Sequence, residues 1–245
     1  MIHVELIAVD GLPEVRPGDD LGGLIADHAH LQARDVLVVA QKVVSKAEGR
    51  LIDLDDVSAS EEAARIAPQL IARPDPRMVQ VALDESVRVL RSVRTLITET
   101  RHGFIAANAG VDHSNVGGHD RLALLPVDPD ASAERLRSRL RELQGVEVGV
   151  IISDTFGRPW RLGIVNVALG VAGLPALVDL RGTRDDYGEP LHATVLAVAD
   201  EIAAAAGLVM GKTNRMPAVV VRGLELSGHG SGRELIRPGD EDLFR

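Results

Sequence analysis

At 245 residues, 45% of them hydrophobic, the chain is long enough to bury a substantial core as one large domain or two small ones. Its net charge of −9 and its few aromatic residues (three Phe, one Trp, one Tyr) argue against nucleic-acid binding, which uses a basic footprint and rings that stack on bases. The absence of cysteine excludes disulfides, thiolate metal sites and cysteine nucleophiles.

The amino terminus reads as a strand and not as a targeting signal. Residues 2–9 have the alternation of apolar and polar side chains that is typical of a strand. They lack the basic start and the small-residue cleavage region of a signal peptide. No apolar run approaches the roughly 18 residues that a membrane-spanning helix needs. We therefore expect a cytoplasmic protein with no membrane partner and no nucleic-acid partner.

The first part of the chain predicts a strand, a helix and a second strand. The strand over residues 2–9 is followed by a short helix over 21–28. Branched apolar residues predict a buried strand over 35–40. The segment 41–50 becomes polar at its end and lies close to the exit of that strand.

Two helices and a hairpin are predicted next. Ser58 and Glu61 have the spacing of a capping box, which predicts a helix over residues 58–72. A second helix is expected over 76–90, because apolar residues recur there on one helical face. Two short apolar segments around a Thr-Arg-His-Gly turn predict a hairpin within residues 94–107.

The second half of the chain mixes helices and strands. We expect helices over residues 131–143 and 192–206, and strands over 148–153 and 218–221. The order of these elements shows no strict βαβ alternation. The pattern therefore predicts an α+β fold with mixed or antiparallel sheets and packed helices.

The most informative segment follows the strand predicted at 148–153. The apolar run stops at Asp154 and Thr155, and a glycine turn at Gly157 comes next. Strand ends of this kind often carry ligand chemistry, because the sheet fixes the side chains while the loop stays open. A carboxylate and a hydroxyl are also the oxygen ligands that Mg²⁺ or Mn²⁺ prefers when it carries a nucleotide phosphate.

A second acid lies in a turn upstream. Asp112 follows an apolar stretch, and Asn115 comes three residues later. Together, Asp112 and Asp154 suggest a metal-phosphate site, with the alternative that each acid only hydrogen-bonds within its own turn. Asn115 has the groups to bind a base, a phosphate or its own backbone. The Thr155 hydroxyl is suited either to ligate a metal or to cap the following turn.

Cations near the predicted strand ends offer charge for a phosphate. Lys46, Arg158 and Arg161 are the candidates, although solvated surface charges are the ordinary use of such residues. No residue stands out as a general base for an amine, and His113 is named as a candidate without support from a motif.

Two glycine-containing segments look like phosphate loops without fitting the pattern. Residues 207–213 end in Gly-Lys-Thr, but the glycines are separated by three residues and follow a helix, whereas a P-loop has four and follows a strand. We expect Gly211 to end that helix instead. The glycine-rich segment 227–232 reads as a flexible surface loop.

Short segments in order along nearly the whole chain carry a family resemblance. They are residues 11–13, 16–21, 43–50, 109–116, 124–130, 153–158, 186–188, 199–203 and 219–223. Together they resemble the coenzyme F420:L-glutamate ligases (F420-0 γ-glutamyl ligases), and the likeness is closest to the amino-terminal ligase domain of the actinobacterial two-domain form. We expect residues 1–245 to form one ligase domain, either alone or ahead of a flavin-binding domain in a longer protein.

The resemblance implies an F420 ligase-like α+β fold and a homodimer with the site near the interface. It implies that the enzyme joins L-glutamate to F420-0 through an amide bond, by way of an acyl phosphate and coupled to hydrolysis of GTP. It also implies two divalent ions per site, Mg²⁺ or Mn²⁺, and leaves a requirement for K⁺ open. A metal-dependent phosphohydrolase and a non-catalytic nucleotide-binding protein are the alternatives.

The resemblance also implies site residues. Its nucleotide contacts fall on Leu12, Pro13, Glu14, Val15, Gln41, Lys46 and Asn115. Asp112 and Asp154 correspond to ligands of one metal, Thr155 to a ligand of the second, and Asp112, Asp154 and Lys46 are the expected catalytic residues. Two positions depart from the pattern. Gln41 stands where some relatives have serine, and Lys212 stands near an acid that touches the second metal in some relatives, a role that lysine cannot fill.

Overall fold

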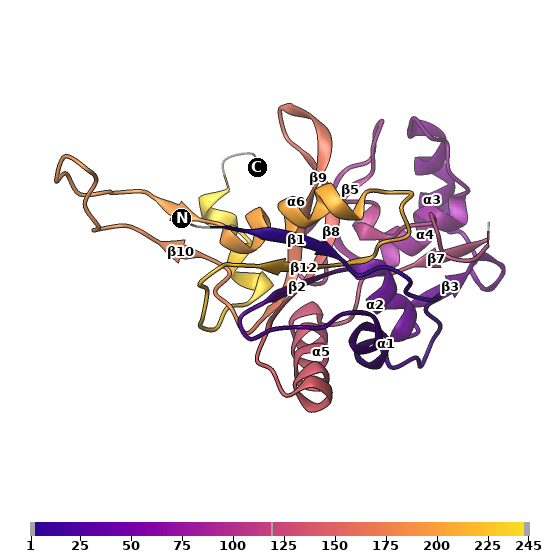
Figure 1. The fold of residues 1–245 in the computed structure, drawn as a ribbon. Helices are drawn as coiled ribbons and strands as arrows, with labels where there is room; N and C mark the ends of the chain where they lie inside the picture. Colours follow the sequence, from indigo (N-terminus) through magenta and orange to yellow (C-terminus); the bar gives the residue numbers. More distant parts are fainter. Residues whose placement is uncertain (1–2, 119, 243–245) are drawn as a thin grey trace.

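A computed structural model describes residues 3–118 and 120–242. Its centre is a five-stranded sheet with the order β1-β12-β2-β8-β9 (Figure 1). The strands are β1 (Glu5–Ala8), β2 (Val36–Ala40), β8 (Gly149–Arg158), β9 (Arg161–Ala172) and β12 (Ala218–Arg222). Within this sheet β2 and β8 run parallel, and the other neighbouring pairs are antiparallel. Residue 2 of the strand expected over 2–9 lies outside the described residues.

Helices cover both faces of this sheet. They are α1 (Leu21–His28), α2 (Gln41–Ala47), α5 (Pro129–Gln144) and α6 (Val198–Met210). In Figure 1, α6 lies above the sheet and α5 below it. The strand residues alternate accordingly: Leu37 and Val39 pack in the core with α1 and α5, whereas Val36 and Val38 pack in the core with α6. This alternation places the main hydrophobic core in two layers.

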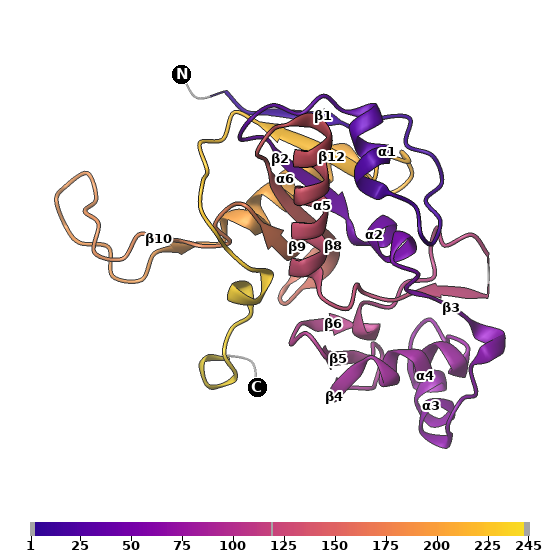
Figure 2. The same cartoon turned by 90° about the horizontal axis from the view of Figure 1, so that it is seen from below.

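A smaller lobe is inserted between α2 and α5, and Figure 2 shows it below the main sheet. Its elements are β3 (Leu51–Asp53), α3 (Glu61–Ile66), α4 (Pro76–Asp84), β4 (Ser86–Arg91), β5 (Ile97–Thr100), β6 (Ile105–Ala107) and β7 (Arg121–Ala123). The strands β4, β5 and β6 form an antiparallel sheet, and β3 pairs with β7. A core of its own packs α3 against α4.

The predicted α+β fold class is confirmed, with mixed and antiparallel sheets and packed helices. The helix of residues 131–143 and the hairpin within 94–107 are also confirmed, as α5 and as the β5–β6 pair. Within the described ranges, 3–118 and 120–242, no helix is both long enough and apolar enough to cross a membrane.

The helices expected over 58–72 and 76–90 have the wrong boundaries. The cap of α3 is Ser60, whose Oγ accepts a hydrogen bond from the Ala63 amide at 3.2 Å, and not Ser58. The second helix, α4, ends at Asp84, and the chain then becomes the strand β4, which pairs with β5. Pairing across the sheet therefore outweighs the helical spacing of the apolar residues in this segment.

The helix expected over 192–206 is α6, and it begins later, at Val198. The preceding residues belong to a two-stranded ribbon of β10 (Val178–Asp179) and β11 (Val195–Leu196). The chain between these strands projects from the body of the molecule as an arm, visible in both views (Figures 1 and 2).

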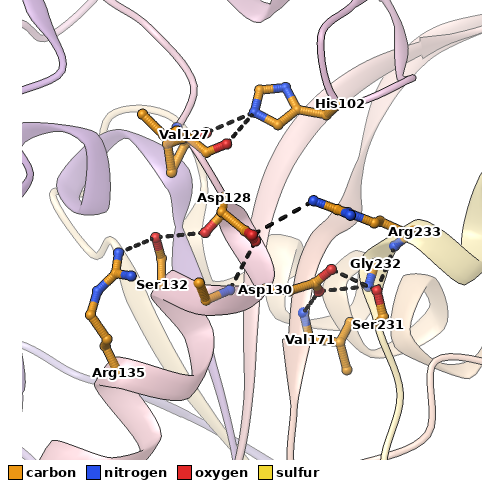
Figure 3. A network of polar contacts seen from close by, with 12 residues as sticks. His102, Val127, Asp128, Asp130, Ser132, Arg135, Val171, Ser231, Gly232 and Arg233 are labelled. Atoms are coloured by element: carbon orange, nitrogen blue, oxygen red, sulfur yellow. Dashed lines mark hydrogen bonds and ion pairs between the residues drawn. The ribbon is translucent and has the colours of Figure 1, made fainter.

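The end of the glycine-rich segment, residues 230–232, is packed, contrary to the expectation of a flexible surface loop over 227–232, whereas residues 227–229 are exposed. A Cβ at Gly232 would lie 2.0 Å from the Leu169 carbonyl oxygen, so only glycine fits there. Figure 3 shows how Asp130 holds this segment: its carboxylate accepts hydrogen bonds from Ser231 Oγ (2.6 Å), the Gly232 amide (2.7 Å) and the Val171 amide (2.8 Å). The segment is thereby fixed between α5 and β9.

Candidate active site

A cavity of about 770 Å³ opens where β2 ends and β8 continues. Its wall comes from the turn before α1, from α2, from the turn after β6, from β8 and β9, and from the segment that follows α6. The ten site residues implied by the family resemblance all line it: Leu12, Pro13, Glu14, Val15, Gln41, Lys46, Asp112, Asn115, Asp154 and Thr155. The fold therefore brings these ten residues together at one place.

Asp154 and Thr155 lie inside a strand, and the expected strand end at residue 153 is wrong. The partner strand β2 stops at Ala40, which pairs with Ser153, while β8 continues to Arg158 against β9. A register irregularity separates Ile152 from Ser153. The two side chains therefore stand where one neighbouring strand has ended, which opens space beside them while the β9 ladder still fixes the backbone.

Asp112 is held by its own turn and by α2. The turn passes through Asn108 and Ala109 with positive φ angles of 51° and 56°. Beyond it, the Asp112 carboxylate accepts a hydrogen bond from the Ser114 amide at 2.8 Å, and Oδ2 lies 2.6 Å from the Lys42 ammonium. Lys42 also donates to the Ser114 carbonyl at 2.5 Å, so the cation ties α2 to this turn.

The two carboxylates differ in their pKa values. Burial alone would raise the pKa of Asp112, but the hydrogen bonds from Lys42 and Ser114 outweigh it and lower that pKa. Burial raises the pKa of Asp154 to about 6, and the nearby negative charge of Asp112 adds to this effect. The Thr155 amide, Lys212 and Lys42 oppose it only in part. An added cation between the acids would favour the ionised form of both.

The opposite wall carries the residues expected to face a nucleotide. Lys46 is buried and forms an ion pair with Glu14 of the first turn. Gln41 is also buried, and its side-chain oxygen accepts a hydrogen bond from Ser45 at 2.8 Å. The Ser153 hydroxyl in the cavity wall is buried without a hydrogen-bond partner among the described residues, so a bound ligand could satisfy it.

Sequence reasoning missed the helix that presents two of the cations. Residues 41–50 were expected as a polar segment near a strand exit, whereas α2 begins at Gln41 directly after β2. Lys42 and Lys46 are four positions apart, which places them on one side of the helix, and both line the cavity. If residues 41–47 are recognised as a helix, the four-residue spacing from Lys46 makes Lys42 a further candidate for a cation facing the site.

Three other candidates are not brought together with the site. Arg158 and Arg161 lie at the exposed end of the β8–β9 hairpin and do not line the cavity. His113 is exposed and is also absent from the cavity wall. Asn166 and Arg215 were not predicted, yet both line the cavity.

The residues present fit one divalent ion. Mg²⁺ is usually bound through one or two carboxylates, with substrate phosphates and water completing its six ligands, and Asp112 with Asp154 meets that need. The described part of the chain contains no group of three or more His, Cys, Asp or Glu side chains placed to hold a metal. Thr155, the expected ligand of a second ion, donates a hydrogen bond to Asn166 at 3.0 Å and accepts one from the Lys212 ammonium. That role of Thr155 stays a prediction.

Comparison with known proteins supplies the family. Residues 11–223 match the model of the F420-0:gamma-glutamyl ligase family. The chain is 49% identical to the coenzyme F420:L-glutamate ligase of Methanopyrus kandleri over 240 residues, covering 95% of this chain and 94% of that one. The chain belongs to the F420-0:gamma-glutamyl ligase family. The ligase of Archaeoglobus fulgidus is 46% identical over 245 residues, covering 100% and 97% of the two chains.

A third relative supports the same assignment. The coenzyme F420:L-glutamate ligase of Haloarcula marismortui is 48% identical over 247 residues, covering 99% of this chain and 96% of that one. The part that matches the F420-0:gamma-glutamyl ligase model includes the complete cavity wall, from Leu12 to Pro217. The candidate site thus lies wholly within the part of the chain that matches the family model.

Proposed function

We propose that this protein joins L-glutamate to F420-0 through a γ-glutamyl amide bond in coenzyme F420 biosynthesis, coupled to hydrolysis of GTP. The observation that carries the proposal is the gathering of three carboxylates and three lysines in one cavity of a chain that belongs to the ligase family. The names of its relatives supply the substrates, coenzyme F420 and L-glutamate. A cytoplasmic homodimer, each chain one ligase domain, completes the proposal.

The chemistry activates a carboxylate for attack by an amine. The γ-phosphoryl group passes from GTP to the F420-0 carboxylate, breaking its bond to the GDP oxygen and forming an acyl phosphate. The glutamate nitrogen then forms a bond to the acyl carbon, inorganic phosphate leaves, and the nitrogen gives up a proton. Phosphoryl transfer asks a protein mainly for positioning and charge neutralisation.

Residues of the cavity could supply this positioning and charge neutralisation. Lys42 and Lys46 face the cavity from α2 and would neutralise phosphate charge. The turn of Leu12, Pro13, Glu14 and Val15, with Gln41 and Asn115, would enclose the nucleotide.

Asp112 and Asp154 would hold Mg²⁺ or Mn²⁺. When bound, that ion would neutralise phosphate charge and polarise the phosphorus–oxygen bonds. A requirement for K⁺ is a finer point of the same proposal.

The test is phosphate release from GTP with Mn²⁺, measured with and without F420-0 and L-glutamate, on the natural protein and on Asp154→Ala. We expect release that needs both substrates, a product heavier by one glutamyl residue, and a loss of at least 100-fold in the variant. Asp56→Ala, an exposed acid outside the cavity, is the matched control.

The other outcomes each point elsewhere. Release that ignores F420-0 and L-glutamate would replace the ligase by a phosphohydrolase. Bound nucleotide without any release would indicate a binding protein. Equal loss in Asp154→Ala and Asp56→Ala would remove the cavity as the site of the reaction.

A further inference from the structure

Lys212 occupies a defined place in the cavity wall. The helix α6 ends at Met210, and Gly211 caps it with a φ angle of 57°, so the chain turns away from the helix axis at this point. The side chain of the next residue, Lys212, lines the cavity, and its ammonium donates a hydrogen bond to Thr155 Oγ1.

The receiving hydroxyl is fixed in turn. Thr155 donates its own proton to Asn166 Oδ1 at 3.0 Å on the neighbouring strand β9. The Asn166 amide points back to α6, with Nδ2 3.6 Å from the Met210 sulfur. These contacts connect β8, β9 and the end of α6, and they orient the oxygen lone pair of Thr155 toward the ammonium and not toward open space.

A divalent ion on the same oxygen would meet this ammonium. A Mg²⁺–oxygen bond is about 2.1 Å and a charged N–H···O contact about 2.8 Å, so the two cations would lie within about 5 Å of each other. At that separation like charges repel strongly inside a cavity, where water screens them poorly. The ammonium and a second ion therefore exclude each other at Thr155.

The supply of carboxylates leads to the same result. Among the residues that the structure describes, the carboxylates in the cavity wall are Glu14, Asp112 and Asp154. Glu14 is paired with Lys46, which leaves Asp112 and Asp154 as anionic ligands. Two carboxylates suit one ion together with nucleotide phosphates, and the cavity wall, as far as the structure describes it, holds no further acid to bind another.

We propose that the Lys212 ammonium takes the place of a second divalent ion, so that each chain binds one Mn²⁺ or Mg²⁺ together with the nucleotide. The inference rests on the proposed function, because it assumes that Asp112 and Asp154 bind a metal–nucleotide complex. It assigns Lys212 a definite part: a permanent positive charge beside the transferred phosphoryl group, fixed by Thr155.

The test counts bound Mn²⁺ by the electron paramagnetic resonance signal of the free ion, with saturating GDP or β,γ-imido-GTP at pH 7.5. We expect one Mn²⁺ per chain in the natural protein and two in Lys212→Glu, in which a carboxylate replaces the ammonium. Lys212→Gln removes only the charge, and we expect it to gain a second, weaker ion. Arg161→Gln, a cation at the exposed hairpin end, should keep one.

The outcomes separate this inference from the proposed function. Two ions per chain in the natural protein would overturn the role of Lys212 and leave the ligase standing. One ion in both Lys212 variants, with nucleotide still bound, would also overturn it. No Mn²⁺ on the nucleotide-bound natural protein would remove the metal site itself and with it the proposed function.

Discussion

The ammonium of Lys42 lies 2.6 Å from Oδ2 of Asp112, and the contact joins α2 to a turn of the smaller lobe. The pair explains why the pKa of Asp112 is lowered although the carboxylate is partly buried. It also means that an arriving cation meets an acid whose charge is already compensated. A divalent ion bound to Asp112, as proposed, would compete with this lysine for the same oxygen.

Removal of this competitor is expected to separate metal binding from catalysis. In Lys42→Gln, Mn²⁺ without nucleotide should bind about three- to tenfold more tightly, because one positive charge near the ion is gone. Ligation should fall at least tenfold, because a cation facing the phosphates is lost. Mn²⁺ titration and a coupled phosphate assay would measure the two effects. Arg121→Gln, which breaks an exposed pair with Asp53, should change neither.

Asp154 should destabilise the metal-free protein at neutral pH, and this destabilisation should be lost in mild acid. Its pKa in the folded protein, about 6, is above the ordinary 3.8, so the folded state holds the proton more tightly than the unfolded state does. The resulting penalty is fully present above pH 6 and disappears as the pH falls from 6 toward 4. We expect Asp154→Asn to be more stable than the natural protein by about 1–3 kcal/mol at pH 7.5.

Urea unfolding at pH 7.5 and pH 4.5, with EDTA in both buffers, would test this sign. The advantage of Asp154→Asn should shrink by more than half at the lower pH. Added Mn²⁺ should reverse the order at pH 7.5, because it stabilises only the protein that retains the carboxylate. An advantage of the same size at both pH values would contradict the role of ionisation.

Gly232 should tolerate no side chain. An added Cβ would lie 2.0 Å from the Leu169 carbonyl oxygen, so Gly232→Ala must push the carboxyl-terminal segment off β9. We expect a loss of about 1–3 kcal/mol, which is a fall of about 3–10 °C in the melting temperature at this chain length. Gly157→Ala in β8, where the surrounding space is open, should change the temperature by less than about 2 °C. Equal shifts in a thermal melt would refute the close packing.

Asp130 should be needed for stability and not for chemistry. Asp130→Ala would leave the amides of Val171 and Gly232 without their acceptor, at a cost of about 2–4 kcal/mol. Asp130→Asn keeps one acceptor oxygen and should lose about half as much. Urea unfolding measures both, and the ligation rate of the folded fraction should stay within twofold. A large loss of rate in folded Asp130→Asn would place this residue in the reaction.

Most strands of the main sheet could be predicted from the sequence, because they are short apolar runs with few alternatives. The helix of residues 21–28 and the strand near 35–40 are found as expected. The end of β8 could not be predicted in the same way. Burial ends near Ser153, but the backbone stays extended as far as Arg158, because β9 satisfies its hydrogen bonds. Only the pairing partner reveals that length.

The errors in the smaller lobe have a similar cause. Val87 and Leu90 fit the helical spacing of α4, yet they lie in β4, where contacts with β5 decide the conformation. The capping-box pattern at Ser58 was a coincidence of spacing, because Ser60 provides the cap without a glutamate at the third helical position. Local patterns fail here because long-range pairing is stronger than either signal.

The candidate site was easier to predict than its surroundings. The ten residues implied by the family resemblance line one cavity, but their neighbours Lys42 and Asn166 belong to a helix and a strand that were not predicted from the sequence. The glycine-rich segment was misjudged because its composition shows flexibility, whereas the need for glycine arises from the closeness of β9. Such closeness between distant segments is absent from a single sequence.

The strand β8 begins in the buried core and ends at the exposed hairpin, so its two halves should differ in how easily their backbone hydrogen bonds open. Ile151 and Ile152 are fully buried, whereas Arg158 is exposed at the hairpin end. Amide hydrogens in the buried half should exchange with solvent only when the whole molecule unfolds, and those in the hairpin half through small local openings. Asp154 and Thr155 lie at this boundary. Ligand binding should therefore register as slowed deuterium uptake at these two amides, without any change in the core.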